Sequence, residues 1–148
     1  IFVIMAASST VSWLLSYAQV PNQFVELLTP YVDNPVVILL LLSLITFITG
    51  MFMEEVSALM LLTPIFAPVA MMAGIDPVHL GIIITLNITI ALITPPMGAC
   101  VYVAAAVSRL EIVSLFRTIW PFVLMAILVL LVLIVFPSLT LWLPTVLG

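Results

Sequence analysis

The sequence predicts an all-α integral membrane protein, and three observations support this fold class. Of its 148 residues, 66% are hydrophobic and 5% are charged, whereas soluble domains have roughly 45–50% and about 25%. The mean hydropathy is +1.53. Six acidic and two basic residues cannot cover a globule with a solvated surface, so lipid is the expected solvent.

Charge and cysteine content exclude several classes of partner and site. The net charge is −4, and the absence of a basic run argues against binding to nucleic acid. The single cysteine, Cys100, cannot form an intrachain disulfide. The first residue, Ile1, lies in an apolar run without an initiator methionine or a signal-peptide pattern, so we expect an N-terminal portion to be missing.

Segment lengths distinguish membrane spans from shorter pieces, because crossing the hydrocarbon core takes roughly 20 apolar helical residues. Residues 1–19 meet this length and are predicted to form a transmembrane helix. Residues 21–34 are predicted to form a polar connection.

Residues 36–73 are predicted to form a re-entrant helical hairpin. The first arm, residues 36–49, offers 14 residues, which are too few to cross. The returning arm, residues 56–73, contains two prolines, so a straight helix facing lipid is not expected there. Polar connections at both outer ends place the Gly-Met-Phe-Met-Glu-Glu tip, residues 50–55, at membrane depth.

Residues 80–108 are predicted to form a broken transmembrane helix. Thr94, Pro95, Pro96 and Gly98 interrupt it, and the two prolines remove backbone donors and disfavour helical geometry in the residue before each ring. Carbonyls freed in this way are tolerated only where protein or a wet cavity satisfies them.

The last predicted span covers residues 118–143, with Trp120 and Trp142 at its ends. A continuous helix would separate these rings by about 33 Å, close to the distance between the interfacial aromatic belts. Arg109 and Arg117 fall in the preceding polar connection, which the positive-inside rule places in the cytoplasm. The outer ends of the hairpin and the C-terminus would then face outward.

Polar side chains at membrane depth mark the candidate site. Glu54 and Glu55 would each cost about 2.5–3.5 kcal/mol in lipid, which favours a cation or substrate pathway at the hairpin tip; the alternative is a shallow turn that reaches interfacial water. Asn87 and Thr94 lie two helical turns apart on one face, and their oxygens suit sodium. The alternative for them is hydrogen bonding between helices.

His79 follows Asp76 and Pro77 in a polar turn, where we expect an interfacial histidine without a catalytic role. No Ser-Lys pair, His-Glu-x-x-His or Gly-x-Ser-x-Gly motif occurs in the sequence, so an intramembrane hydrolase has no visible nucleophile or zinc site. The chain is therefore not expected to be an enzyme.

Five sequence motifs, taken in their order along the chain, resemble those of a known protein family. They are Gly-Met-Phe-Met-Glu (50–54), Leu-Thr-Pro-Ile-Phe-Ala-Pro (62–68), Gly-Ile-Asp-Pro-Val-His-Leu-Gly (74–81), Asn87 and Ile-Thr-Pro-Pro-Met-Gly (93–98). Together they resemble the large membrane (permease) subunit of tripartite ATP-independent periplasmic (TRAP) transporters, in its C-terminal half. The resemblance covers most of the chain and is strongest from Gly50 to Val103.

The resemblance implies a fold of inverted repeats, each with a re-entrant hairpin and a broken helix, as in the ion transporter superfamily. It also implies sodium-coupled, elevator-type uptake of a small organic anion, such as a C4-dicarboxylate or sialic acid, across the bacterial inner membrane by a multi-pass protein. The expected partners are a small membrane subunit and a periplasmic substrate-binding protein. Sodium is the expected coupling ion, with no organic cofactor.

The same resemblance assigns site residues. Residues expected at the sodium site are Gly50, Glu54, Asn87, Thr94, Pro95, Met97 and Gly98, with Gly50, Thr94 and Met97 as direct ligands. Residues expected at the substrate are Thr94, Pro95, Pro96, Gly98 and Ala99.

Two other functions remain open from the sequence. A stand-alone sodium-carboxylate symporter of similar hairpin architecture would not need a soluble binding protein. A non-transporting membrane anchor or assembly subunit would explain the apolar helices without a role for intramembrane acids.

Overall fold

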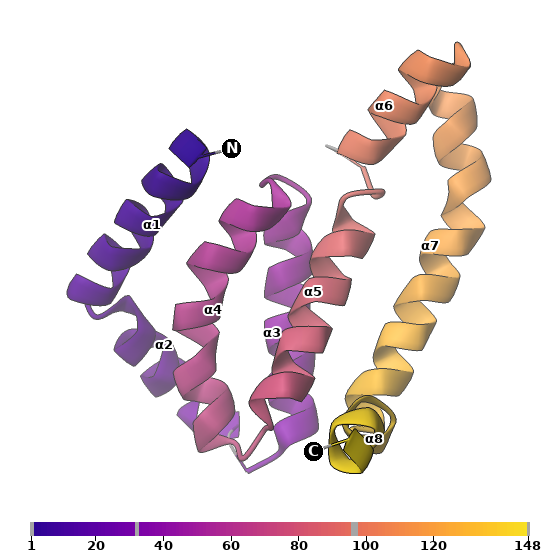
Figure 1. The fold of residues 1–148 in the computed structure, drawn as a ribbon. Coiled ribbons are helices and arrows are strands. Elements are labelled where there is room, and N and C mark those ends of the chain that lie inside the picture. The colour runs from indigo at the N-terminus through magenta and orange to yellow at the C-terminus, as the bar shows by residue number, and fades with distance from the viewer. Residues whose placement is uncertain (1, 32, 96–97, 148) are drawn as a thin grey trace.

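The computed structural model describes residues 2–31, 33–95 and 98–147, and its regular elements are all helical over these ranges (Figure 1). This confirms the all-α prediction. The elements are α1 (Phe2–Tyr17), α2 (Val20–Leu28), the 3-10 helix η1 (Thr29–Tyr31), α3 (Pro35–Gly50), α4 (Glu55–Met72), α5 (Pro77–Ala91), α6 (Ala99–Ser108), α7 (Ile112–Val135) and α8 (Ser138–Leu147).

Helices α3, α4 and α5 form the centre of the molecule, and local sequence fixes where two of them begin. Asn34 caps α3 and Asp76 caps α5, and each side chain accepts hydrogen bonds from the backbone N–H groups of the first turn. A proline follows each cap as the first helical residue, where its missing N–H costs no hydrogen bond.

Helix α4 continues through Pro64 and Pro68 and ends at Met72, with Ala73 as its C-cap and Gly74 directly after it. Gly74 has φ +70°. The Gly74 N–H donates to the Met71 carbonyl at 3.1 Å and the Ile75 N–H donates to the Ala70 carbonyl at 2.9 Å, which is the Schellman arrangement. The chain therefore reverses sharply between α4 and α5.

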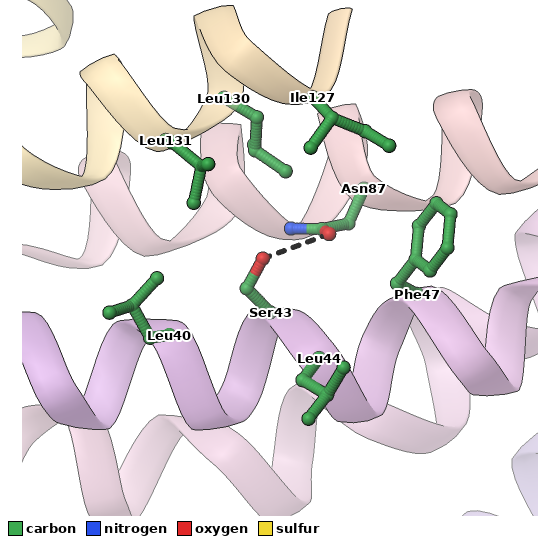
Figure 2. A pocket seen from close by; sticks show the side chains of 8 residues that line it. All are labelled: Leu40, Ser43, Leu44, Phe47, Asn87, Ile127, Leu130 and Leu131. Atoms are coloured by element: carbon green, nitrogen blue, oxygen red, sulfur yellow. Dashed lines mark hydrogen bonds between the residues drawn. The ribbon is translucent and has the colours of Figure 1, made fainter. Parts of the chain in front are cut away.

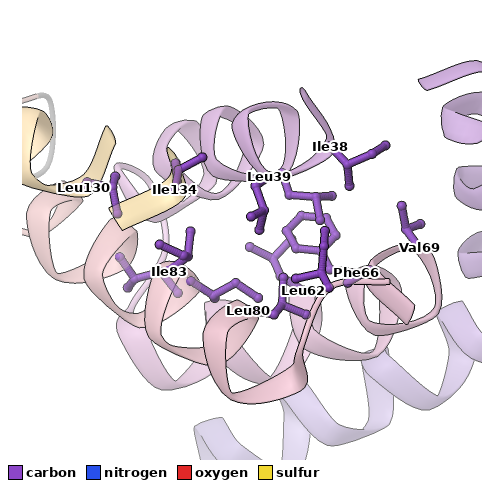
Figure 3. Packing of buried hydrophobic residues seen from close by; sticks show 14 of the residues in the cluster. Ile38, Leu39, Leu62, Phe66, Val69, Leu80, Ile83, Leu130 and Ile134 are labelled. Carbon is purple, nitrogen blue, oxygen red and sulfur yellow. The ribbon is translucent and has the colours of Figure 1, made fainter. Parts of the chain in front are cut away.

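The core lies between α3, α4, α5 and the second half of α7 (Figure 3). Phe66 of α4, 1% exposed, is among its largest side chains. The residues labelled in Figure 3 are Ile38, Leu39, Leu62, Phe66, Val69, Leu80, Ile83, Leu130 and Ile134. Their burial between helices holds the hairpin α3–α4 against α5.

Helix α2 corrects the prediction of a polar connection over residues 21–34. Phe24 packs against Phe66, with ring centroids 5.8 Å apart, and Leu28 is buried. A short amphipathic helix therefore docks on α4, because its apolar residues recur at helical spacing among polar neighbours.

The predicted span over residues 118–143 is also wrong in its position. Helix α7 begins at Ile112 and ends at Val135, so Arg117 lies within it and Trp142 lies on the separate helix α8. Phe136 has φ −118° and ψ 77°, outside the helical region, which is disfavoured for a residue that precedes proline. The two tryptophans therefore do not measure one crossing, although the 24 residues of α7 span about 36 Å.

Two helices, Glu55–Met72 and Ile112–Val135, are long and apolar enough to cross a membrane. Pro35–Gly50 and Pro77–Ala91 are apolar but shorter. Helix α1 has 16 residues, or about 24 Å, and so is shorter than the predicted 1–19 span.

Candidate functional site

The predicted interruption separates α5 from α6. Helix α5 ends at Ala91 and α6 begins at Ala99. Local backbone bonds order the part between them: the Thr94 N–H donates to the Ala91 carbonyl at 3.0 Å, the Gly98 N–H to the Thr94 carbonyl at 3.1 Å and the Cys100 N–H to the Leu92 carbonyl at 3.4 Å. The described residues on both sides of positions 96–97 are thus tied by backbone hydrogen bonds at the end of the apolar helix α5.

Thr94 lies in the segment between α5 and α6 and is 4% exposed. Its hydroxyl donates to the Ile90 carbonyl at 2.7 Å. Because a hydroxyl has one proton and two lone pairs, the same oxygen can still accept a hydrogen bond or bind a cation.

Gly98 ends this segment in a conformation that suits glycine. It has φ +45° and precedes the first residue of α6. A Cβ built there would lie 2.7 Å from Cζ of Phe116 on α7. Phe116 also meets Tyr102 of α6 edge-on, with centroids 6.1 Å apart, so the break is seated against α7 through this ring.

Gly50 brings the hairpin tip to the same region. It is the last residue of α3, and a Cβ built on it would lie 3.0 Å from the Ala91 Cβ and 3.5 Å from the Ile88 Cα. The absence of a side chain therefore allows α3 to approach α5 closely just before the break. The structure thus brings Gly50 against the last turn of α5, just before the segment that contains Thr94 and Gly98.

Glu54 lies on the other side of the hairpin turn, at the start of α4. Its carboxylate accepts hydrogen bonds from the Ser57 N–H at 3.1 Å and the Ser57 hydroxyl at 3.2 Å, and Glu54 is exposed. The N-terminal end of a helix favours a negative charge. In this structure Glu54 therefore acts as the N-cap of α4.

Four helices have an end at the hairpin tip or at the break. Helices α3 and α5 end at Gly50 and Ala91, which lie against each other. Helix α4 begins at Glu55, across the hairpin turn, and α6 begins at Ala99, beyond the break (Figure 1). Helix C-termini present carbonyl oxygens and a partial negative charge, and helix N-termini present N–H groups and a partial positive charge. The region therefore offers groups suited to a cation and groups suited to an anion.

Asn87 lies elsewhere, about two turns before the break. It is 1% exposed; its Nδ2 donates to the Ile83 carbonyl at 2.8 Å, and its Oδ1 accepts from the Ser43 hydroxyl at 2.9 Å. Figure 2 shows this pair joining α3 to α5 beneath leucines of α7, at a cavity of about 380 Å³. This is the bond between helices that the sequence left open as the alternative for Asn87.

The remaining predicted site residues are placed only in part. Pro95 is exposed. Pro96 and Met97 lie outside the described residues, as does the side chain of Ala99, whose backbone begins α6. Within the described part of the chain, no three His, Cys, Asp or Glu side chains group as metal ligands.

Sequence reasoning missed several contributing residues. Ser43 and Ser57 are the polar partners of Asn87 and Glu54, and a lone serine in an apolar helix is the only signal that could have indicated the first. His79, expected at the interface, is instead buried at 2% exposure. Its Nδ1 lies 2.6 Å from the Thr140 hydroxyl of α8, a contact that no local pattern predicts.

The sequence of the chain matches a known protein family. Residues 1–139 match the family model described as "Tripartite ATP-independent periplasmic transporter, DctM component".

Three curated relatives are similar over nearly the whole chain. The sialic acid TRAP transporter large permease protein of Vibrio cholerae is 39% identical over 89% of the chain and 31% of its own length. The ectoine/5-hydroxyectoine TRAP transporter large permease protein of Ruegeria pomeroyi is 36% identical over 97% of the chain and 33% of its own length. The C4-dicarboxylate TRAP transporter large permease protein of Pseudomonas aeruginosa is 34% identical over 98% of the chain and 34% of its own length. The chain spans about a third of the length of these relatives.

Proposed function

The chain belongs to the DctM family of TRAP transporters, and from this membership we propose that it forms part of a sodium-coupled secondary transporter for a small organic anion. The observation that supports this most is the contact of Gly50 with Ile88 and Ala91. It brings the last residue of α3 against the end of α5, just before the break.

Sodium would be held by neutral oxygens at the C-terminal ends of α3 and α5. The Thr94 hydroxyl is buried and already oriented by its bond to Ile90, and carbonyls at Gly50 and Met97 are the other proposed ligands. Discontinuous helices of secondary transporters bind cations in this way. Glu54 contributes negative charge near the tip while it caps α4.

The organic anion would lie at the N-terminal end of α6. Gly98 and Ala99 begin this helix without a side-chain cap, so backbone N–H groups and the helix dipole favour a carboxylate there. The three relatives carry sialic acid, ectoines and C4-dicarboxylates by name, all of which contain carboxylate groups. A basic partner for the carboxylate would come from outside these residues.

The heights of the elements support a re-entrant hairpin and an elevator-type movement. The α3–α4 tip ends below the level that the α6–α7 connection reaches, while α7 runs from near that connection down to α8 (Figure 1). A hairpin that stops within the membrane can carry a site with it when the surrounding scaffold stays fixed.

The proposal includes a location and partners. The complete transporter would be a multi-pass protein of the bacterial inner membrane, assembled with a small membrane subunit. A periplasmic binding protein would deliver the anion, as the tripartite family description implies.

The proposal is tested by uptake of radiolabelled carboxylates into proteoliposomes that contain the whole transporter and its binding protein, with or without an inward sodium gradient. Thr94→Ala should raise the sodium concentration needed for half-maximal uptake by roughly tenfold, the equivalent of about 1.4 kcal/mol, because a buried ligand oxygen is lost. Thr94→Ser should restore most of the sodium affinity.

Thr89→Ala is the matched control. Thr89 lies on α5, five residues before Thr94, and its hydroxyl makes the same kind of bond to the carbonyl four residues earlier, but it is exposed and precedes the break. Sodium-independent uptake, or equal effects of the two alanine variants, would contradict the proposal. Uptake without the binding protein would favour the stand-alone symporter, and a lack of uptake by the wild type would favour an anchor.

A further inference from the structure

Helix α8 is fixed to the start of α5 by a short chain of hydrogen bonds far from the break. His79 Nδ1 lies 2.6 Å from the Thr140 hydroxyl oxygen, and that hydroxyl donates to the Pro137 carbonyl at 2.8 Å. His79 and Thr140 are 2% and 9% exposed. The two residues are 61 positions apart in sequence, so the bond joins elements that no local turn connects.

The bond pattern determines which nitrogen of His79 carries the proton. A threonine hydroxyl has one proton, and Thr140 uses it on Pro137. The Thr140 oxygen must therefore accept, which places the imidazole proton on Nδ1. Nε2 is then a bare acceptor, and it is buried without a partner among the described residues.

Protonation of Nε2 would destabilise this arrangement. An Nε2–H donor would be buried without an acceptor, and the ring would carry a charge in apolar surroundings. The cavity beside the ring, about 190 Å³, is lined mostly by apolar residues: Pro35, Val36 and Leu39 of α3 and Ile134, Pro137 and Leu141 of the α7–α8 region. Asp76 is the one other ionisable residue among the described lining residues.

Asp76 opposes this effect without removing it. Its carboxylate would favour a nearby positive charge, but it makes no hydrogen bond to Nε2; its Oδ1 accepts from the backbone N–H groups of Val78 and His79. The lining residues of α3, α7 and α8 carry no ionisable group that could accept from Nε2.

We infer that His79, Thr140 and the Pro137 carbonyl form a proton-sensitive latch, which docks α8 on the start of α5 while the imidazole is neutral and releases it when Nε2 is protonated. The junction is suited to movement, because the chain turns at Phe136 and Pro137 and leaves the helical conformation there. The adjacent cavity gives the helix room to move.

The test measures the position of α8 in the whole transporter in proteoliposomes. Spin labels are placed at Met72 and Leu139, which are 54% and 59% exposed, in a background without other cysteines, and the distance between them is measured by pulsed electron paramagnetic resonance. Between about pH 8 and about pH 5, the ratio of undocked to docked molecules should rise at least roughly tenfold.

Three variants separate protonation from simple packing. His79→Asn keeps an N–H near the position of Nδ1 but cannot titrate, so α8 should stay docked at both pH values. Thr140→Val keeps the shape and removes the hydroxyl, so α8 should be released at both. Asp76→Asn preserves the cap and removes the charge, so release should need a lower pH.

A wild-type distance that does not change with pH would overturn the inference. So would an equal pH response in His79→Asn, because the titrating group would then be another residue. A second label pair on α3 and α4 should show no change with pH, and a change there would mean that the hairpin itself unfolds, which also contradicts a local latch.

Discussion

At the scale of single residues, the glycines differ in backbone conformation and in the space around them. Gly98 has a positive φ and lies against the Phe116 ring, Gly74 has a positive φ in open space, and Gly50 has ordinary helical geometry but touches Ala91. A side chain would meet backbone strain alone at Gly74, a steric contact alone at Gly50, and both at Gly98. Gly81 combines ordinary geometry with open space and serves as their common reference.

Substituting alanine at these glycines should give a graded series of stabilities. Gly81→Ala should raise the free energy of unfolding by about 0.5–1 kcal/mol, because glycine is unfavourable inside a helix. Gly74→Ala should lower it by about 1–2 kcal/mol through the left-handed conformation alone. Gly98→Ala should lower it further, because the Phe116 ring must also move. Thermal unfolding of the purified transporter checks the order, and equal effects at Gly74 and Gly98 would contradict the contact.

Gly50→Ala tests whether the tip must touch α5. The added methyl would lie 3.0 Å from the Ala91 Cβ, and such overpacking costs roughly 1–3 kcal/mol. Ala91→Gly in the same protein removes the opposing methyl, so the double variant should transport better than Gly50→Ala alone. Uptake assays with the four proteins of this cycle give the coupling. Purely additive effects would show that the two residues do not meet.

At the scale of elements, a hydrogen bond between α3 and α5 and a ring between α6 and α7 hold the helices in register. The Ser43–Asn87 pair is buried beneath α7, and Phe116 seats the break against the same helix. Asn87 and Thr94 are both buried polar residues, yet the first stabilises the packing of two helices and the second lies in the interrupted segment.

Ser43→Ala should destabilise the transporter without changing its sodium dependence. The substitution leaves the Asn87 Oδ1 buried without its donor, which should lower the free energy of unfolding by about 1–3 kcal/mol. The double variant Ser43→Ala, Asn87→Leu replaces both polar groups and should restore much of the stability. Thermal unfolding and sodium titration of uptake distinguish the outcomes. An increase in the sodium requirement of Ser43→Ala matching that of Thr94→Ala would place Asn87 at the ion after all.

At the scale of the whole molecule, two connections mark opposite ends of the helices. The α4–α5 turn and α8 lie at one end, and the α6–α7 connection lies at the other (Figure 1). The basic residues Arg109 and Arg117 lie in or beside that connection, which the positive-inside rule places in the cytoplasm.

Membrane-impermeant thiol labelling of intact cells checks this orientation. A cysteine at Asp33 should react from outside, and a cysteine at Glu111 should react only after permeabilisation. Both residues are exposed; Asp33 lies just before α3 and Glu111 just before α7, and these two helices begin at opposite ends of the structure (Figure 1). Both variants are made in a background that lacks Cys100. The reverse pattern would invert the orientation and with it the proposed side of hairpin opening.

The sequence by itself determined the fold class, the hairpin segment and the region of the break. These features follow from composition, from helix length and from prolines, which act through local backbone geometry and the cost of polar groups in lipid. The caps at Asn34 and Asp76 are local in the same sense. Motif order also indicated the family, which the comparison with known proteins then showed.

Only the tertiary structure decided which polar groups meet. Asn87 and Thr94 share a helical face, but α3 places Ser43 opposite the first and the chain breaks around the second. Likewise, the predicted last span continued to residue 143 because its hydropathy does not change, whereas α8 turns back so that Thr140 bonds to His79. Such contacts join residues distant in sequence, and apolar helices of uniform composition carry little information about which of their faces will pack together.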